Sequence, residues 1–386
     1  MRTSFLLVQL ALTSTGSALA TNTPGLQNLG NTCYLNAQLQ SAFHIPRVRQ
    51  LVQASASEGS SSVLVPQDTA YVDDNELCSP ALLALARLFH DMDTSSSAVD
   101  PRQFCQALGI PVFQQQDSQE FWKLLLPTLQ LRPLTKLYSG KLESYIRALD
   151  GSGRHRNRPE PFLDLSLDLQ PATSSSVESS VRTLFGEPEL LSAAEGNGWR
   201  PDKDSEPVDA HKGSRLTEDL PSILQLHLKR FQFDWQTETM SKLNDPVSFP
   251  LSLDLPVEAP AEGPLDASKC RYVLQAVVIH SGQYGSGHYY SYVRPDVRKE
   301  ETWLRFNDHD VEKVTWQDVT ADAYGGLQDA PMSSTKNFFS RLAAIFKRKH
   351  SQTKSHGYGG ESSSAYVLQY VRQCDIPELY GGEPSQ

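Results

Sequence analysis

Apolar residues in the first part of the chain recur at intervals of three and four, which is the period of a helix with one buried face. The leucines of Cys33–Phe43 follow this interval, and Pro46 is expected to end the helix. Ser79-Pro80 supplies an N-cap and a proline at the first helical position, so another helix is predicted to begin there. Further helices are predicted at 101–108 and 114–127.

Further along the chain the apolar positions alternate with polar ones, which is the period of a half-buried strand. Phe162–Leu169 alternates strictly, and Ser222–Phe233 places its leucines on one face. Strands are also predicted at Tyr272–His280, Gly287–Arg294, Thr302–Phe306 and Ala365–Arg372, and a short helix at Leu184–Leu191. Helices followed by strands indicate an α+β domain, in contrast to alternating βαβ units.

Three stretches do not fit this succession of elements. Residues 54–79 are rich in Ser, Ala and Asp and are expected to form a surface loop. Residues 327–357 form an insertion that contains a basic amphipathic helix, Phe338–Lys349. This helix could contact an anionic membrane or lie in the groove of a partner; the alternative is that it packs on its own domain. Residues 373–386 are expected to form a C-terminal tail.

The N-terminal residues 1–20 resemble a secretory signal peptide, with Arg2, a short apolar run and small residues at the end. The run is too short to span a membrane. Scattered cysteines and the lack of an Asn-x-Ser/Thr glycosylation site count against secretion. We therefore expect the chain in the cytoplasm or nucleus, or in the secretory pathway if this segment works as a signal.

Composition narrows the class of protein. With 386 residues, of which 39% are apolar, the chain can bury a sizeable core. Its 45 acidic and 35 basic side chains give a net charge of −10, which argues against nucleic-acid binding and suits a basic protein or peptide as substrate. The five cysteines form no CxxC pair, so neither a disulfide framework nor a metal or cofactor site is predicted.

Cys33 lies where a loop that contains glycines and asparagines becomes a helix. At such a position the unpaired backbone N–H groups and the helix dipole favour a thiolate, which is the nucleophilic form of cysteine. A nucleophilic cysteine also needs a base, and the base needs an acceptor that orients it. The alternative interpretation is a small, half-buried cysteine at the start of a core helix.

Among the ten histidines, His288 has the surroundings expected of such a base. It follows a glycine-rich loop and begins an aromatic strand, so another backbone can approach it while the strand holds the imidazole in place. His280, at the end of the preceding strand, is the weaker candidate. Asn307, at the end of a later strand, is expected to accept the Nδ1–H of His288, so that Nε2 faces the sulfur of Cys33.

Several separated stretches resemble, in the same order, the motifs of one family. Gly25–Asn36 is similar to the cysteine box of the ubiquitin-specific proteases, Gln116–Phe121 to their QQD-xEF motif and Leu220–Phe231 to their LHLKRF strand. Gly287–Val293 together with Trp303–Asp308 resembles their histidine box. The Tyr-Gly-Gly tripeptide that follows the last of these motifs most resembles the herpesvirus-associated branch of the family.

This resemblance implies a papain-like α+β fold shaped as a right hand. The catalytic domain would occupy residues 24–372, with a helical thumb at about 24–134, β fingers at about 135–230 and a β-sheet palm at about 231–372. The implied activity is that of a cysteine-type deubiquitinase, which hydrolyses isopeptide bonds at the C-terminal glycine of ubiquitin and takes ubiquitinated proteins as substrates. The zinc-binding cysteine pairs of most members are missing here, so no metal is expected.

The matched motifs also imply roles for individual residues. The nucleophile would be Cys33, the base His288, the orienting residue Asn307 with Asp308 beside it, and the oxyanion-hole amide Asn28. Contacts with the ubiquitin tail are implied for Asp117, Glu120, Gln116, Tyr289, Gly285 and Gly287, the two glycines belonging to a loop that must move aside. From the residues alone, Asp117 and Glu120 have the spacing of a helix capping box, and one carboxylate can serve both purposes.

Three other functions stay open on the sequence. A catalytically inactive chain of the same family would bind ubiquitin without cleaving it. A protease of this kind could instead act on another ubiquitin-like modifier. A secreted papain-like peptidase would cleave general peptides and would be processed after Ala20.

Overall fold

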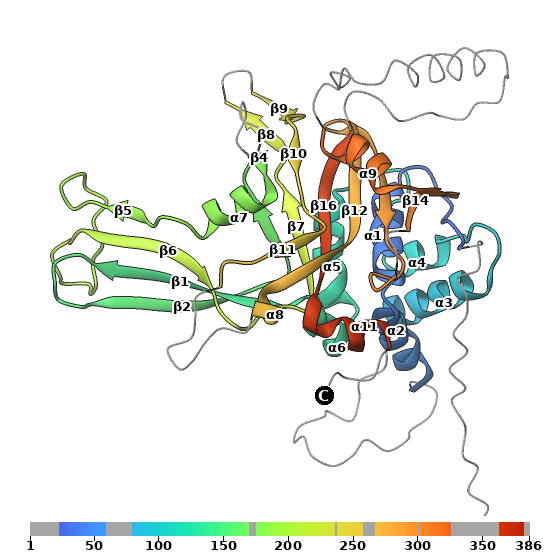
Figure 1. Cartoon of the computed structure of the whole chain (residues 1–386), viewed down its shortest axis with the longest axis horizontal. Helices are drawn as coiled ribbons and strands as arrows, with labels where there is room; N and C mark the ends of the chain where they lie inside the picture. The colour runs from blue at the N-terminus through green and yellow to red at the C-terminus, as the bar shows by residue number, and fades with distance from the viewer. Residues whose placement is uncertain are drawn as a thin grey trace, which may run out of the picture.

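The computed structural model describes residues 23–58, 79–169, 175–235, 238–257, 267–299, 302–325 and 363–381. In Figure 1 the N-terminal helices lie on one side, a large sheet runs through the middle and a smaller sheet projects to the opposite side. The described helices before the first strand are α1 (Cys33–Phe43), α2 (Pro46–Glu58), α3 (Pro80–Thr94), α4 (Arg102–Ala107), α5 (Ser118–Thr128) and α6 (Arg132–Tyr138).

The helix starts follow the capping residues. Ser79 caps α3, since its hydroxyl oxygen accepts a hydrogen bond from the backbone N–H of Leu82 at 3.1 Å, and the prediction there is confirmed. Pro46 was expected to end the first helix, but α1 ends at Phe43 and Pro46 begins α2. The predicted start at residue 114 is also too early, because the N-cap of α5 is Asp117. The loop expected at 54–79 is wrong for residues 54–58, which belong to α2, and residues 59–78 lie outside the described residues.

Every residue of α1 is buried, so this helix forms the centre of the helical part. Buried polar side chains are tolerated where they find hydrogen-bond partners. Gln225 on the large sheet donates to Gln38 of α1 at 3.2 Å and to Gln369 at 3.0 Å, and Gln369 donates to the carbonyl of Ser41 at 3.2 Å. This network joins α1, and with it Cys33, to the large sheet.

Among the described strands, eight form the large sheet, in the order β15-β14-β13-β12-β16-β7-β3, with β11 also paired to β12. They are β3 (Leu165–Leu167), β7 (Ile223–Leu228), β11 (Ser252–Asp254), β12 (Arg271–Gln283), β13 (Ser286–Val293), β14 (Trp303–Asn307), β15 (Asp310–Val314) and β16 (Ser364–Arg372). β12 and β13 form a hairpin in which Ser281 pairs with His288, and β14 lies on the other side of β13. The sheet therefore places the start of β13, which contains His288, beside the end of β14, which contains Asn307.

The residue pattern predicted no strands in the smaller sheet, which lies within the residues that the resemblance assigns to β fingers. Its order is β2-β1-β6-β5, and its strands are β1 (Gly140–Ala148), β2 (His155–Phe162), β5 (Glu189–Leu191) and β6 (Ala210–Leu216). Most side chains of β1 and β2 are partly or fully exposed, so these strands lack the alternation that marks a sheet with one buried face. β3 and β7 fall within the range expected for the fingers, but they pair in the large sheet.

Two local predictions are corrected. The strand expected over Phe162–Leu169 shrinks to β3, since Phe162 is the last residue of β2. The helix expected at Leu184–Leu191 is wrong, because α7 (Val177–Leu184) ends where that helix was to begin. The remaining elements are β4 (Ser175–Ser176), β8 (Phe231–Asp234), β9 (Thr239–Lys242), β10 (Val247–Ser248), α8 (Ala267–Cys270), α9 (Trp316–Ala323), a 3-10 turn (Gln373–Asp375) and α11 (Ile376–Tyr380).

Two predicted segments, residues 1–20 and the helix Phe338–Lys349, lie outside the described residues. In the part of the chain that the structure describes, no helix is both long and apolar enough to cross a membrane. Within the same residues, no group of three or more His, Cys, Asp or Glu side chains is arranged to hold a metal ion.

Candidate active site

Cys33 is the first residue of α1, and its side chain is only 2% exposed. Its sulfur accepts a hydrogen bond from the backbone N–H of Tyr289, the residue after His288 on β13. The side-chain amide Nε2 of Gln115 lies 3.8 Å from the same sulfur. The structure therefore brings the helix start, the histidine strand and the segment before α5 together at Cys33.

Burial and, to a lesser extent, the nearby negative charge of Asp308 raise the pKa of the Cys33 thiol to about 11. Hydrogen bonds from Tyr289, Gln115 and Tyr34 act in the opposite direction and do not compensate. The expectation of a resting thiolate is thus wrong for this state, because the cost of burying the charge exceeds the benefit of the helix start. Cys33 needs a base that removes its proton during the reaction.

His288 is joined to Asn307 by a hydrogen bond of 2.6 Å between Nε2 and Oδ1. The amide oxygen only accepts, so the proton of the ring sits on Nε2 and the basic ring nitrogen is Nδ1. The predicted partners are therefore correct, but the predicted ring nitrogen is wrong, since Nδ1 was expected to face Asn307. Nδ1 is the nitrogen that can take a proton from the thiol.

Asp308 follows Asn307 with a φ of 53°, a backbone conformation that is uncommon outside glycine. Its carboxylate accepts hydrogen bonds from Nδ2 of Asn28 at 2.9 Å and from Nδ2 of Asn36 at 2.8 Å, and it lies 3.8 Å from Nε2 of His288. Two amides thus hold one negative charge beside the nucleophile. Asn36 was missed, although its position three residues after Cys33 puts it on the same helix face.

The side chain of Asn28 is fixed at both ends. Its oxygen accepts from the backbone N–H groups of Gly30 and Thr32 at 3.0 and 3.1 Å, while its nitrogen donates to Asp308. An amide nitrogen carries two protons, and Asp308 accepts one of them. The arrangement holds Asn28 on the loop that leads into Cys33, where the predicted oxyanion-hole donor must lie.

Gln115 was also missed, because the resemblance pointed to its neighbour. Its Nε2 donates to the carbonyl of Gly287 at 2.7 Å, and its Oε1 accepts from the N–H of Gly287 at 3.4 Å. Gln116 is exposed. The glutamine that connects the nucleophile with the loop before His288 is therefore Gln115, and side-chain direction along an extended segment decides which of two adjacent glutamines points inward.

The acidic pair lies at the start of α5. Asp117 caps the helix, since its carboxylate accepts from the N–H groups of Gln119 and Glu120 at 2.8 and 3.0 Å, which confirms its predicted capping role. The hydroxyl of Tyr366 donates to the other oxygen of Asp117. Glu120 is exposed. Tyr289 is buried with its ring centroid 5.8 Å from that of Tyr366, so an aromatic wall stands beside the carboxylates.

The hairpin turn between β12 and β13 contains Gly285 and Gly287. Gly285 has a φ of +73° and open space around it, whereas a Cβ on Gly287 would lie within 2.6 Å of Cε1 of His280. His280 itself is buried between aromatic rings, and burial together with Lys242 lowers its pKa to about 3. The weaker candidate base is therefore a packing residue that supports the turn.

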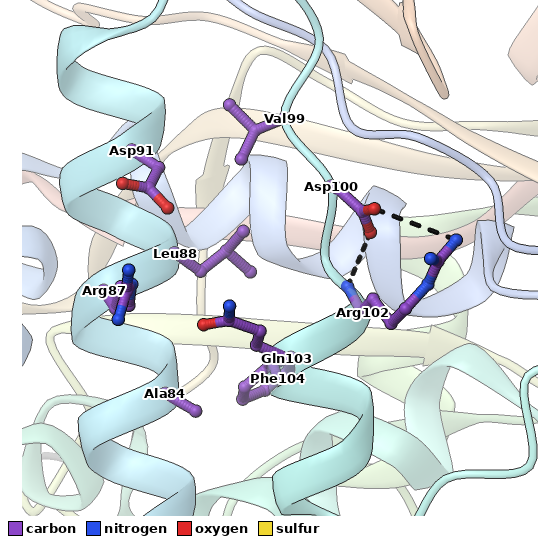
Figure 2. A pocket seen from close by; sticks show the side chains of 9 residues that line it. All are labelled: Ala84, Arg87, Leu88, Asp91, Val99, Asp100, Arg102, Gln103 and Phe104. Atoms are coloured by element: carbon purple, nitrogen blue, oxygen red, sulfur yellow. Dashed lines mark hydrogen bonds and ion pairs between the residues drawn. The ribbon is translucent and has the colours of Figure 1, made fainter.

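A separate hollow of about 370 Å³ lies between α3 and α4 (Figure 2). Two of its charged residues pair with each other, since Asp100 accepts from the backbone N–H of Arg102 at 2.8 Å and lies 3.8 Å from its guanidinium. None of the residues that line it belongs to the Cys33 site. The candidate site is thus the junction at Cys33.

Comparison with known proteins finds similarity over most of the chain. The family model described as ubiquitin carboxyl-terminal hydrolase matches residues 24–370. The chain is 32% identical to ubiquitin carboxyl-terminal hydrolase 15 of Schizosaccharomyces pombe over 78% of this chain and 25% of that protein. It is 29% identical to ubiquitin C-terminal hydrolase 12 of Arabidopsis thaliana over 92% of this chain and 30% of that protein. It is 30% identical to ubiquitin carboxyl-terminal hydrolase 15 of Saccharomyces cerevisiae over 92% of this chain and 27% of that protein. The chain thus spans less than a third of the length of these relatives.

Proposed function

Because the chain belongs to the ubiquitin carboxyl-terminal hydrolase family, we propose that it is a cysteine-type deubiquitinase that cleaves isopeptide bonds at the C-terminal glycine of ubiquitin. The observation that best supports this is the hydrogen-bonded pair of His288 and Asn307 on strands beside the sulfur of Cys33. The names of the relatives describe the same hydrolysis at the ubiquitin C-terminus.

In the acylation step, Nδ1 of His288 takes the proton of the Cys33 thiol as the sulfur attacks the glycine carbonyl carbon. A C–S bond forms, and the carbonyl oxygen becomes an oxyanion. The backbone N–H of Cys33 and the amide of Asn28 are the donors proposed to stabilise it. The C–N bond then breaks, the lysine amine leaves with the proton from His288, and ubiquitin remains bound to the sulfur as a thioester.

In the deacylation step, His288 removes a proton from a water molecule, whose oxygen attacks the thioester carbonyl. The C–S bond breaks and its electron pair returns to sulfur, which regains a proton from His288. The products are the ubiquitin carboxylate and the Cys33 thiol. Asn307 keeps the imidazole oriented through both steps, since its oxygen holds Nε2–H at 2.6 Å.

The ubiquitin tail is proposed to approach along the start of α5. Asp117 and Glu120 present carboxylates there, and a basic peptide is their natural partner. The buried rings of Tyr289 and Tyr366 would form the wall of the channel. The Tyr-Gly-Gly tripeptide that begins at Tyr324 supports the further proposal that the chain belongs to the herpesvirus-associated branch.

Incubation with di-ubiquitin tests the proposed function. The wild-type chain is expected to release mono-ubiquitin, and Cys33→Ala is expected to release none. Parallel incubation with conjugates of other ubiquitin-like modifiers separates the alternatives. Cleavage of one of those conjugates and not of di-ubiquitin, or binding of ubiquitin without cleavage, would replace the proposal.

A further inference from the structure

Phe113 is a large apolar side chain that is 81% exposed, and it lies two residues before Gln115. Single exposed apolar residues are common on protein surfaces and need no explanation by themselves. Phe113 differs because the segment that carries it is fastened to the loop leading into Cys33. The ring therefore lies at the edge of the site.

Two hydrogen bonds hold the segment of Phe113 to the cysteine loop. The backbone N–H of Asn31 donates to the carbonyl of Val112 at 2.8 Å, and the side-chain amide of Asn31 donates to the carbonyl of Phe113 at 2.5 Å. Both contacts lie within three residues of Cys33. The position of Phe113 is thus tied to that of the nucleophile.

The ring of Phe113 lies against Gly30. A Cβ on Gly30 would lie 3.0 Å from Cδ1 of Phe113 and 3.2 Å from the carbonyl oxygen of Val112, and the φ of Gly30 is +135°. Only glycine adopts this backbone conformation readily and leaves room for the ring. Because residue 30 has no side chain, the ring of Phe113 can pack directly against the loop.

Three residues of the segment 113–117 contact three different parts of the site. Phe113 contacts the loop before Cys33, Gln115 reaches the sulfur at 3.8 Å, and Asp117 lies with Tyr366 on the side where the ubiquitin tail is proposed to enter. The acyl half of an isopeptide and its amine half extend in opposite directions from the carbonyl carbon. Phe113 therefore stands on the side of the amine half.

We propose that Phe113, which packs against Gly30, binds the leaving-group half of the substrate. This half consists of the aliphatic side chain of the acceptor lysine and the peptide around it. This inference rests on the proposed function and adds a specificity residue to it. The exposed ring offers an apolar face to the methylene groups of the lysine.

The test compares two substrates that share ubiquitin and differ in the leaving group. One is ubiquitin joined through an isopeptide bond to the lysine of a short peptide, and the other is ubiquitin ethyl ester, whose leaving group is ethanol. Phe113→Ala is expected to lower kcat/KM for the isopeptide about tenfold and to change kcat/KM for the ester less than about twofold. Phe113→Tyr, which keeps the ring, is expected to restore the isopeptide rate.

Leu83→Ala is the matched control, because Leu83 is another exposed apolar residue, 45% exposed on α3. It should change neither substrate's rate. If Phe113→Ala lowers both rates equally, or neither, the leaving-group role is wrong. If the wild-type chain hydrolyses neither substrate, the proposed function itself fails, so the two failures are distinguishable.

Discussion

Replacing Gly287 with alanine tests how closely the turn before His288 is packed. The added Cβ would lie 2.6 Å from Cε1 of His280 and 2.7 Å from the carbonyl oxygen of Ser281. His280 is 2% exposed and stands 4.8 Å, between ring centroids, from Tyr289, so it has little room to move away. The backbone at Gly287 must therefore shift.

The size of that shift follows from the contact distances. Ordinary contact begins at 3.4 Å, so relief of the clash requires a displacement of roughly 1 Å. Overpacking of this kind costs about 1–3 kcal/mol of stability. Because His288 is the next residue, the displacement also moves the base relative to Cys33, and a misplacement of about 1 Å lowers the rate about 10²-fold.

The assay measures kcat/KM for ubiquitin ethyl ester and the free energy of unfolding in urea. Gly140→Ala is the matched control, because its Cβ would lie 2.6 Å from Cζ of Phe162 and 2.7 Å from Cδ of Pro221 at the start of β1, outside the Cys33 site. Both variants should lose stability, and only Gly287→Ala should lose activity. Wild-type kcat/KM in Gly287→Ala would refute the packing argument.

Three further predictions concern Cys33, Tyr366 and Ser79. The rate at which iodoacetamide alkylates Cys33, measured by mass spectrometry of its peptide, should rise about tenfold per pH unit from pH 7 to 9. The reason is that a thiol with a pKa of about 11 gains thiolate over this whole range. A rate that levels off below pH 8 would show a resting thiolate. Tyr366→Phe removes the hydroxyl that donates to Asp117, so KM for ubiquitin substrates should change more than kcat. The free energy of unfolding should also fall by about 1.5–3 kcal/mol, because a hydrogen bond to a charged group is lost. A change in kcat alone would contradict this prediction. Ser79→Ala should lower the free energy of unfolding by about 1 kcal/mol in urea titration, with unchanged kcat/KM, and an unchanged urea midpoint would contradict the capping role.

The elements that pack one face against the core could be predicted from the sequence. α3 shows a capping serine, a proline and helical spacing, and the hairpin of β12 and β13 shows a buried run interrupted by glycines. The individual strands of the smaller sheet could not be predicted from the residue pattern, because most side chains of β1 and β2 are partly or fully exposed and the strands are held by pairing with one another. Hydrogen bonds between the backbones of distant segments impose no regular alternation of apolar and polar residues on the sequence.

The residue types of the site could be predicted better than their geometry. The partnership of His288 and Asn307 was expected, but which ring nitrogen faces the amide depends on the angle at which β13 and β14 meet. The protonation state of Cys33 depends on a balance between burial and the helix start, which only the packing decides. Asn36 belongs to the site through its hydrogen bond to Asp308, a residue that is distant in the sequence, so its role could not be predicted from its neighbours.

The central claim is that Cys33 attacks the C-terminal glycine of ubiquitin. It is tested most directly by incubating the chain with ubiquitin that carries an electrophile at its C-terminus and measuring the intact mass. One added ubiquitin is expected, located on the peptide that contains Cys33, and none in Cys33→Ser. An adduct that persists in Cys33→Ser, or that maps to another residue, would contradict it.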